Sequence, residues 1–360
     1  MTDEYLPGQK GVDASQDGTG ALPQKVFRKK ARHSPDLAAI GAGILNGSIN
    51  DLAKAITYIE SSSPAHYTYG QELLQAMLPY TGKSIRIGIT GVPGAGKSTF
   101  IESFGIRLCE EGHRVAVLAV DPSSSISGGS ILGDKTRMEQ LARHPNAFIR
   151  PSPSGGTLGG VHRKTRETML LCEAAGFNMI LVETIGVGQS EYMVRGMTDF
   201  FMLLVLTGAG DELQGIKKGI LELADAIIVN KADGENKLPA QKTKREYDQL
   251  LHMLKPSTKG WRSKAFVCSA LKQEGMGEIW TAIQSFQSLT EASGVMADRR
   301  RSQTKDWLHT LIAEQLHQFF YRHPYIKTNL TEWERLAMDG KIMPAQAAGE
   351  LFGKVMKKTE

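Results

Sequence analysis

The stretch IRIGITGVPGAGKST, Ile85 to Thr99, decides the fold of this chain. It begins as an apolar, β-rich run and ends in the pattern G-x-x-x-x-G-K-[ST]. A strand followed by such a loop and then by an amphipathic helix is typical of a P-loop, whose glycines let backbone N–H groups surround a phosphate. Lys97 would place its charge at the β- and γ-phosphates, and Ser98 would offer its hydroxyl to Mg²⁺. The predicted phosphate site consists of Gly91, Val92, Pro93, Gly94, Ala95, Gly96, Lys97, Ser98 and Thr99.

The P-loop strand is one of several short apolar runs that alternate with helical stretches. These runs are nearly continuous in apolar residues, as expected for strands that a parallel sheet buries on both faces. The pattern predicts an α/β fold with a doubly wound, mostly parallel sheet. The predicted strands are IRIGIT (85–90), RVAVLAV (114–120), AFIR (147–150), MILVET (179–184), FFMLLVL (200–206), DAIIVN (225–230) and KAFVCS (264–269).

Four regions are expected along the chain. Residues 1–35 form a polar and basic tail with little to bury, which predicts disorder. Residues 36–82 carry apolar positions at helical spacing and predict a small helical subdomain. The sheet-forming domain is expected over 83–292, and a helical region over 293–360. In that last region the apolar stripe from Trp307 to Phe319 must pack either on the sheet-forming domain or on another copy of the chain. Thr331 and Glu334 match a capping box that predicts a helix start, and Pro344 predicts the start of the last helix.

Composition excludes several classes of protein. The 360 residues are 41% hydrophobic, and 43 basic residues against 38 acidic ones give a net charge of only +5, which does not suggest a nucleic-acid or membrane-surface protein. Three separated cysteines indicate neither a disulfide framework nor a thiolate metal site. The sequence shows no apolar run long enough for a bilayer and no leader pattern, so a cytoplasmic location is expected.

A second motif identifies the base of the nucleotide. Asn230, Lys231 and Asp233 form N-K-x-D after a predicted strand, and Ser269, Ala270 and Leu271 follow the last strand. A carboxylate can accept from guanine N1–H and the exocyclic amino group together, whereas adenine N1 would face it with a lone pair. The chain is therefore expected to bind GTP and GDP and to reject ATP.

Three carboxylates near strand ends are candidates for orienting Mg²⁺ and its waters: Asp121, Asp134 and Glu183. Glu183 opens an E-x-x-G pattern whose Gly186 would sense the γ-phosphate through its backbone N–H. Lys97, Asp121 and Glu183 are the expected catalytic set. The alternatives are a turn or N-cap carboxylate for Asp121, an N-cap for Asp134 and a solvated strand end for Glu183. Val187, and not a glutamine, follows Gly186, so slow unaided hydrolysis is expected.

Together the long motifs GITGVPGAGKST, LAVDPSSSISGGSILGDKTRM, FIRPSPSGGTLGG, VETIGVGQSE, GAGDELQGIKKGILELAD and NKAD resemble the MeaB family, named ArgK in older bacterial usage and MMAA in mitochondria. These are SIMIBI-class P-loop GTPases that act as chaperones of adenosylcobalamin-dependent acyl-CoA mutases. The resemblance implies GTP turnover stimulated by the mutase, control of cofactor loading, and protection or rescue of the mutase. It also implies a homodimer through the C-terminal helices and leaves room for indirect coupling to an adenosyltransferase.

The resemblance further assigns a partner-coupling switch to Asp211, Gln214 and Lys217. From the residues alone the same segment matches an N-cap and capping box, which requires no switch. Two other functions stay open: a kinase of an amino-acid transport protein, which Asp233 opposes because a kinase would use ATP, and a nickel-delivery GTPase, for which a His-rich tract is missing from the sequence.

Overall fold

The computed structural model describes residues 34–61, 63–120, 138–151, 158–184, 190–208 and 218–356. Its centre is a seven-stranded parallel sheet in the order β3-β2-β4-β1-β5-β6-β7. The strands are β1 (Ile85–Gly91), β2 (Val115–Val120), β3 (Ala147–Arg150), β4 (Met179–Thr184), β5 (Phe200–Val205), β6 (Ala226–Val229) and β7 (Lys264–Val267). The predicted fold class and all seven predicted strands are confirmed.

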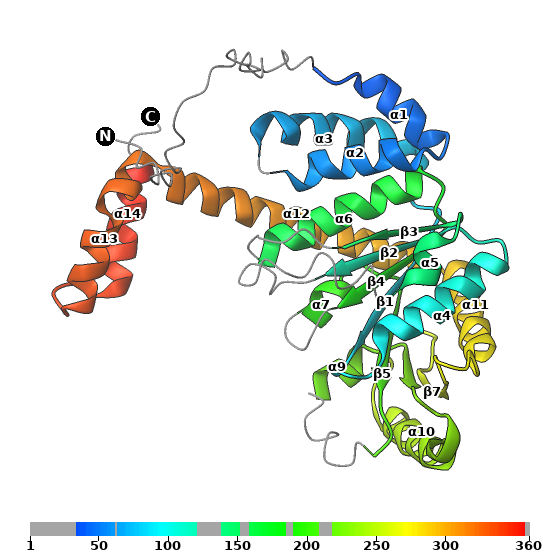
Figure 1. The fold of residues 1–360 in the computed structure, drawn as a ribbon. Coiled ribbons are helices and arrows are strands. Elements are labelled where there is room, and N and C mark those ends of the chain that lie inside the picture. The colour runs from blue at the N-terminus through cyan, green and yellow to red at the C-terminus, as the bar shows by residue number, and fades with distance from the viewer. Residues whose placement is uncertain are drawn as a thin grey trace, which may run out of the picture. The chain divides into compact units, whose positions relative to one another are not determined.

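Strand β1 lies inside the sheet, between β4 and β5 (Figure 1). The chain passes from β1 toward β2 and β3 on one side, returns to β4, and then crosses to β5 on the other side. Such a reversal of strand order opens a crevice at the carboxyl ends of the strands, where ligands bind in open α/β sheets. The P-loop that follows β1 is therefore at the topological switch point.

Helices cover both faces of the sheet because successive strand residues alternate between the faces. One face packs on α4 (Lys97–Glu110), α5 (Glu139–Arg143) and α11 (Met276–Ala292), with Phe100, Phe104 and Phe286 fully buried. The other face is covered by α6 (Leu158–Ala174), α7 (Ser190–Arg195), α9 (Lys218–Leu223) and α10 (Lys237–Met253). Helices α1 (Leu37–Leu45), α2 (Ile49–Glu60) and α3 (Pro64–Met77) pack on one another and on α6 (Figure 1). Short 3₁₀ turns cover Leu78–Tyr80 and Gly234–Asn236.

The C-terminal region is helical, as expected. It consists of α12 (Val295–Arg322), α13 (Pro324–Met338) and α14 (Pro344–Met356). The beginning of α12 contacts the sheet-forming domain, whereas Leu308, Ile312, Leu316 and Phe319 farther along are 47–62% exposed. Helices α13 and α14 pack on each other around Ile326, Leu351 and Val355.

The capping box predicted at Thr331 and Glu334 is wrong, because both residues lie inside α13. That helix begins at Pro324, and His323 caps it by accepting a hydrogen bond from the Tyr325 N–H. The start of α14 at Pro344 is confirmed. Within the part of the chain that the structure describes, no helix is both long and apolar enough to cross a membrane.

Candidate functional site

The P-loop lies between β1 and α4 and curves around the side chain of Lys97. The Lys97 ammonium donates to the carbonyls of Gly91 (2.8 Å) and Val92 (3.4 Å), which holds it against the inner side of the loop. Burial lowers the pKa of Lys97, although the nearby carboxylates of Glu183 and Glu191 oppose this shift. A cation that is partly desolvated in this way interacts more strongly with an anion than a solvated lysine does.

Gly96 can be replaced by no other residue without distortion, because its φ is +82° and a Cβ would lie 2.8 Å from Asn230 Nδ2. The phosphate loop therefore lies directly against Asn230, the first residue of the N-K-x-D segment that is expected to read the base. The Asn230 amide donates to the Ala95 carbonyl (2.8 Å), and its oxygen accepts from the Ala270 N–H (3.1 Å). Asn230 is 1% exposed, so both bonds are shielded from water and connect three segments that are distant in the sequence.

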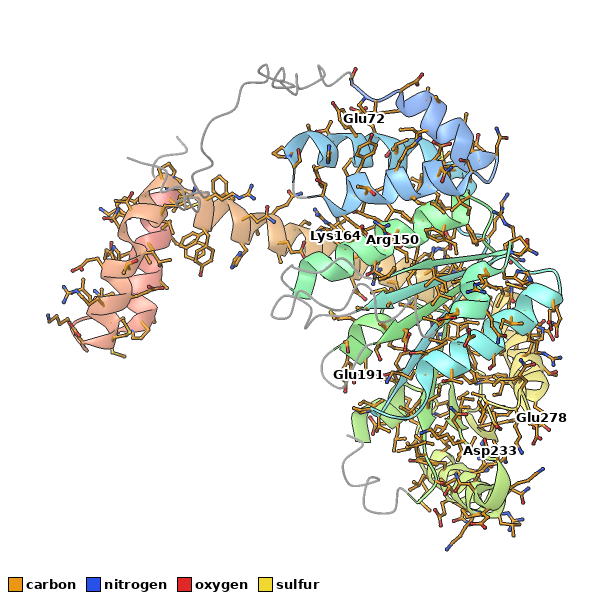
Figure 2. All side chains as sticks on the ribbon, in the orientation of Figure 1. Glu72, Arg150, Lys164, Glu191, Asp233 and Glu278 are labelled. Atoms are coloured by element: carbon orange, nitrogen blue, oxygen red, sulfur yellow. The ribbon has the colours of Figure 1, made fainter. Side chains whose placement is uncertain are left out.

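The carboxylate of Asp233 is held in a defined direction. Its Oδ2 accepts from the Ser269 hydroxyl at 2.6 Å, and the same hydroxyl accepts from the Lys272 N–H at 3.2 Å. Lys231 adopts a left-handed backbone with φ +60°, which is rare for a residue with a Cβ and is typical of strained functional segments. Asp233, which Figure 2 labels, follows β6 in the chain. Ala270 is buried with Asn230, whereas the side chain of Leu271 is 78% exposed.

Of the predicted magnesium ligands, the structure brings together Ser98 and Glu183. The Ser98 hydroxyl lies 3.3 Å from Glu183 Oε1, at the junction of α4 and β4. Glu183 is 3% exposed and pairs in register with Ile89 of β1 and Ala119 of β2. A hydroxyl and a carboxylate side by side are hard oxygen donors that suit Mg²⁺. Asp121 and Asp134 lie outside the described residues, among which no group of three or more His, Cys, Asp or Glu side chains is arranged to hold a metal ion.

The sequence after Glu183 leads into α7. Gly186 lies outside the described residues, and so do Asp211, Gln214 and Lys217 of the predicted switch. Helix α7 itself is described, and its Glu191, which Figure 2 labels, is 1% exposed. Its carboxylate lies close enough to Lys97 to favour the charged ammonium. On the outer side, a Cβ at Gly219 would collide with the Tyr192 hydroxyl, so α7 also touches the start of α9. Helix α7 thus lies between the phosphate loop and the helix that follows residues 209–217.

Buried polar contacts attach the carboxyl end of α7 to α6 and α12. The Arg166 guanidinium of α6 donates to the Gly196 carbonyl and to the Gln303 carbonyl of α12, the latter at 3.0 Å. The Gln303 amide donates in turn to the Thr198 carbonyl at 2.9 Å. Arg166 and Gln303 are both 8% exposed, and burial lowers the pKa of Arg166 to about 10. We call these contacts the α7 anchor.

Two fully buried aspartates extend the α7 anchor to the amino ends of β5 and β6. Asp199 accepts from both Arg300 Nε (2.8 Å) and Arg300 Nη2 (2.6 Å), and Asp225 pairs with Arg195 (3.5 Å) and Arg299 (3.8 Å). Sequence reasoning missed this network. The available signal was an acidic residue directly before each of two buried strands, together with the run Arg299–Arg300–Arg301.

The sequence and the fold of this chain were compared with those of known proteins. The family model for "Methylmalonyl Co-A mutase-associated GTPase MeaB" matches residues 52–324. A putative GTPase of Caulobacter vibrioides is 49% identical over 315 residues, which cover 88% of this chain and 96% of that protein. The mitochondrial "methylmalonic aciduria type A homolog" of Mus musculus is 46% identical over 320 residues, covering 86% of this chain and 77% of that protein. A crystal structure described as a "LAO/AO transport system kinase" has a TM-score of 0.72 at 37% identity and covers 89% of this chain and 97% of that one.

Proposed function

Because this chain belongs to the MeaB family of methylmalonyl-CoA mutase-associated GTPases, and hydrolyses GTP to GDP and phosphate as that family does, we propose that its partner is an adenosylcobalamin-dependent acyl-CoA mutase. In this proposal GTP turnover gates loading of the cofactor into the mutase and protects or reactivates the mutase. The observation that carries the nucleotide part is the pair of bonds through which Asn230 joins the phosphate loop to the base-reading segment.

The proposed division of roles follows from the chemistry of each side chain. Lys97 would neutralise charge on the β- and γ-phosphates, and backbone N–H groups of residues 91–99 would surround them. Ser98 and Glu183 would hold Mg²⁺, with Asp121 and Asp134 as further candidates. The ion would supply electrostatic stabilisation of the phosphoryl group. Asp233 would read guanine, with Ser269 holding its carboxylate in place.

Helix α7 is the proposed connection between hydrolysis and the partner. It follows the E-x-x-G segment, and its Glu191 is buried near Lys97, so a change at the γ-phosphate would reach α7 directly. The α7 anchor joins that helix to α12. We propose that α12, whose Leu308, Ile312, Leu316 and Phe319 are exposed along one face, contributes to a homodimer interface. Residues 211–217 remain the proposed coupling switch.

The two alternative functions make different predictions. The kinase in the name of the structural relative would require phosphate transfer from ATP to a protein, and the carboxylate of Asp233 opposes adenine binding. A nickel-delivery GTPase would need a metal-binding cluster, and the described residues contain none. We therefore favour the mutase-associated function.

The decisive experiment measures GTP and ATP hydrolysis by the purified chain, alone and with each of several adenosylcobalamin-dependent acyl-CoA mutases. We expect slow GTP turnover alone, marked stimulation by one cognate mutase, and negligible ATP turnover. A parallel assay follows release of adenosylcobalamin from the chain's mutase complex with GTP or GDP bound. Equal turnover of ATP, or fast GTP hydrolysis that no mutase changes, would contradict the proposal.

A further inference from the structure

A cavity of about 350 Å³ lies at the amino-terminal edge of the sheet, at the opposite ends of the strands from the P-loop. Its wall comes from the end of α9, the end of α10 and the loop 254–263 that leads into β7. Cavities of this volume are within the range that small organic ligands occupy. None of the residues assigned above to the nucleotide, the metal or the coupling switch lines it.

One side of the cavity is apolar. Leu221, Leu251 and Leu254 line it together with Trp261, whose side chain is 9% exposed. The indole N–H of Trp261 is already committed to the Asp225 carbonyl at 3.0 Å. The tryptophan side chain therefore offers the cavity no free donor and contributes only apolar surface to its wall.

The other side carries positive charge. Lys255 and Arg262 line the cavity beside His252, and Glu222 is the one acidic residue in the wall. Among the residues that the structure describes, neither Lys255 nor Arg262 forms a salt bridge. Within the described residues neither charge is thus neutralised by a carboxylate, and both residues are exposed to solvent where they line the cavity.

The contact between Arg262 and His252 adds a donor. The guanidinium Nη2 approaches His252 Nδ1, and because arginine has no acceptor, Nδ1 must accept. The ring hydrogen of the neutral imidazole is then on Nε2. His252 is thus present as a hydrogen-bond donor at Nε2, in addition to the two cationic groups.

We propose that this cavity is a binding site for a small organic anion that has a flat apolar body and a phosphate or carboxylate group. The apolar body would lie on Trp261 and the leucines, and the anion would face Lys255 and Arg262. One wall residue, Ser257, donates to Asp225 at 2.9 Å, and Asp225 pairs with Arg195 of α7 and Arg299 of α12. The site therefore borders the network that holds α7.

Calorimetric titration with 1-naphthyl phosphate tests the site, with Mg²⁺ and saturating GDP present to occupy the nucleotide site. We expect saturable binding to the wild-type chain and a loss of roughly tenfold in affinity for each of Lys255→Gln and Arg262→Gln, since each removes one charge-assisted contact. Lys259→Gln is the matched control, because Lys259 is exposed on the same loop but does not line the cavity. Its affinity should equal that of the wild type.

Two further ligands test separately whether the site needs the anionic group and the apolar body. Inorganic phosphate lacks the apolar body and 1-naphthol lacks the anion, so both should bind at least about tenfold more weakly than 1-naphthyl phosphate. Absence of saturable 1-naphthyl phosphate binding would overturn the proposal. Unchanged affinity in the Lys255→Gln/Arg262→Gln double variant, with an unchanged melting temperature, would overturn it equally, as would 1-naphthol binding as tightly as the phosphate.

Discussion

Replacement of Asp233 by asparagine should change which base the chain binds, and the direction follows from the bond to Ser269. The Ser269 hydroxyl donates to Asp233 Oδ2 at 2.6 Å. In Asp233→Asn the same hydroxyl can be satisfied only by the amide oxygen, so the amide nitrogen turns toward the base. That nitrogen would meet the N1–H and amino group of guanine donor to donor, but it would donate to the C2 oxygen of xanthine.

The magnitude can be estimated from the bonds that are lost. In the proposed binding mode guanine would make two hydrogen bonds to the carboxylate, and a hydrogen bond to a charged group contributes about 1.5–3 kcal/mol. Loss of both gives roughly 3–6 kcal/mol, which is a decrease of about 10² to 10⁴ in GTP affinity. The substitution does not touch the two hydrogen bonds of Asn230 to Ala95 and Ala270, so the phosphate loop should keep its geometry.

The assay is equilibrium binding of GDP and of xanthosine diphosphate, with Mg²⁺, to the wild type, Asp233→Asn and the control Glu235→Gln. The control removes the same charge two positions away, from an exposed side chain. We expect Asp233→Asn to prefer the xanthosine nucleotide and the control to behave as the wild type. Unchanged GDP affinity in Asp233→Asn would refute the assignment of Asp233 to the base.

Three other predictions concern the metal, the α7 anchor and pH. Glu183→Gln should weaken the apparent Mg²⁺ affinity in GTP hydrolysis by about 10–100-fold, measured by magnesium titration, and an unaltered titration would exclude Glu183 from the metal site. Arg300→Met leaves the fully buried Asp199 without its cation and should cost about 3–5 kcal/mol in unfolding free energy, measured with guanidinium. The Asp199→Asn/Arg300→Met double variant should recover part of that loss, and no recovery would show that the two side chains do not act as a pair. Burial raises the pKa of Glu167 above the usual value of 4.5, so the folded protein favours the protonated carboxyl. The stability that this form contributes is fully present below pH 4.5 and is lost as the pH rises through the raised pKa. Glu167→Gln should therefore raise the melting temperature at pH 7 but not near pH 4, and an equal shift at both values would contradict the assignment.

Most of the fold, and the residues expected to read the base, could be read from the sequence because their signals are local. Each strand is a short apolar run, and the P-loop and N-K-x-D are contiguous motifs that follow a strand. The start of α13 was mispredicted because Thr331 and Glu334 fit a capping box, while the stronger local signal was Pro324. Proline restricts the preceding residue, and His323 is indeed extended with φ −60° and ψ 131°.

The α7 anchor could not be predicted, because its partners are joined only by the tertiary fold. Arg300 and Asp199 are 101 positions apart, and Arg166 and Gln303 are 137 positions apart. No local pattern indicates which arginine of Arg299–Arg300–Arg301 points inward. The structure shows that Arg299 and Arg300 do so, whereas the guanidinium of Arg301 pairs with Asp298 at the surface.

The α7 anchor has a thermodynamic consequence for any protein that docks on α12. Coupling between two binding sites is reciprocal: if docking on α12 raises GTP affinity tenfold, GTP must raise the docking affinity tenfold, about 1.4 kcal/mol in each direction. Arg166 of α6 and Gln303, in the buried first part of α12, are neither among the residues assigned to GTP nor on the exposed face of α12 from Leu308 to Phe319. A variant at either position would lower this shared coupling free energy while leaving each ligand's own contact residues in place.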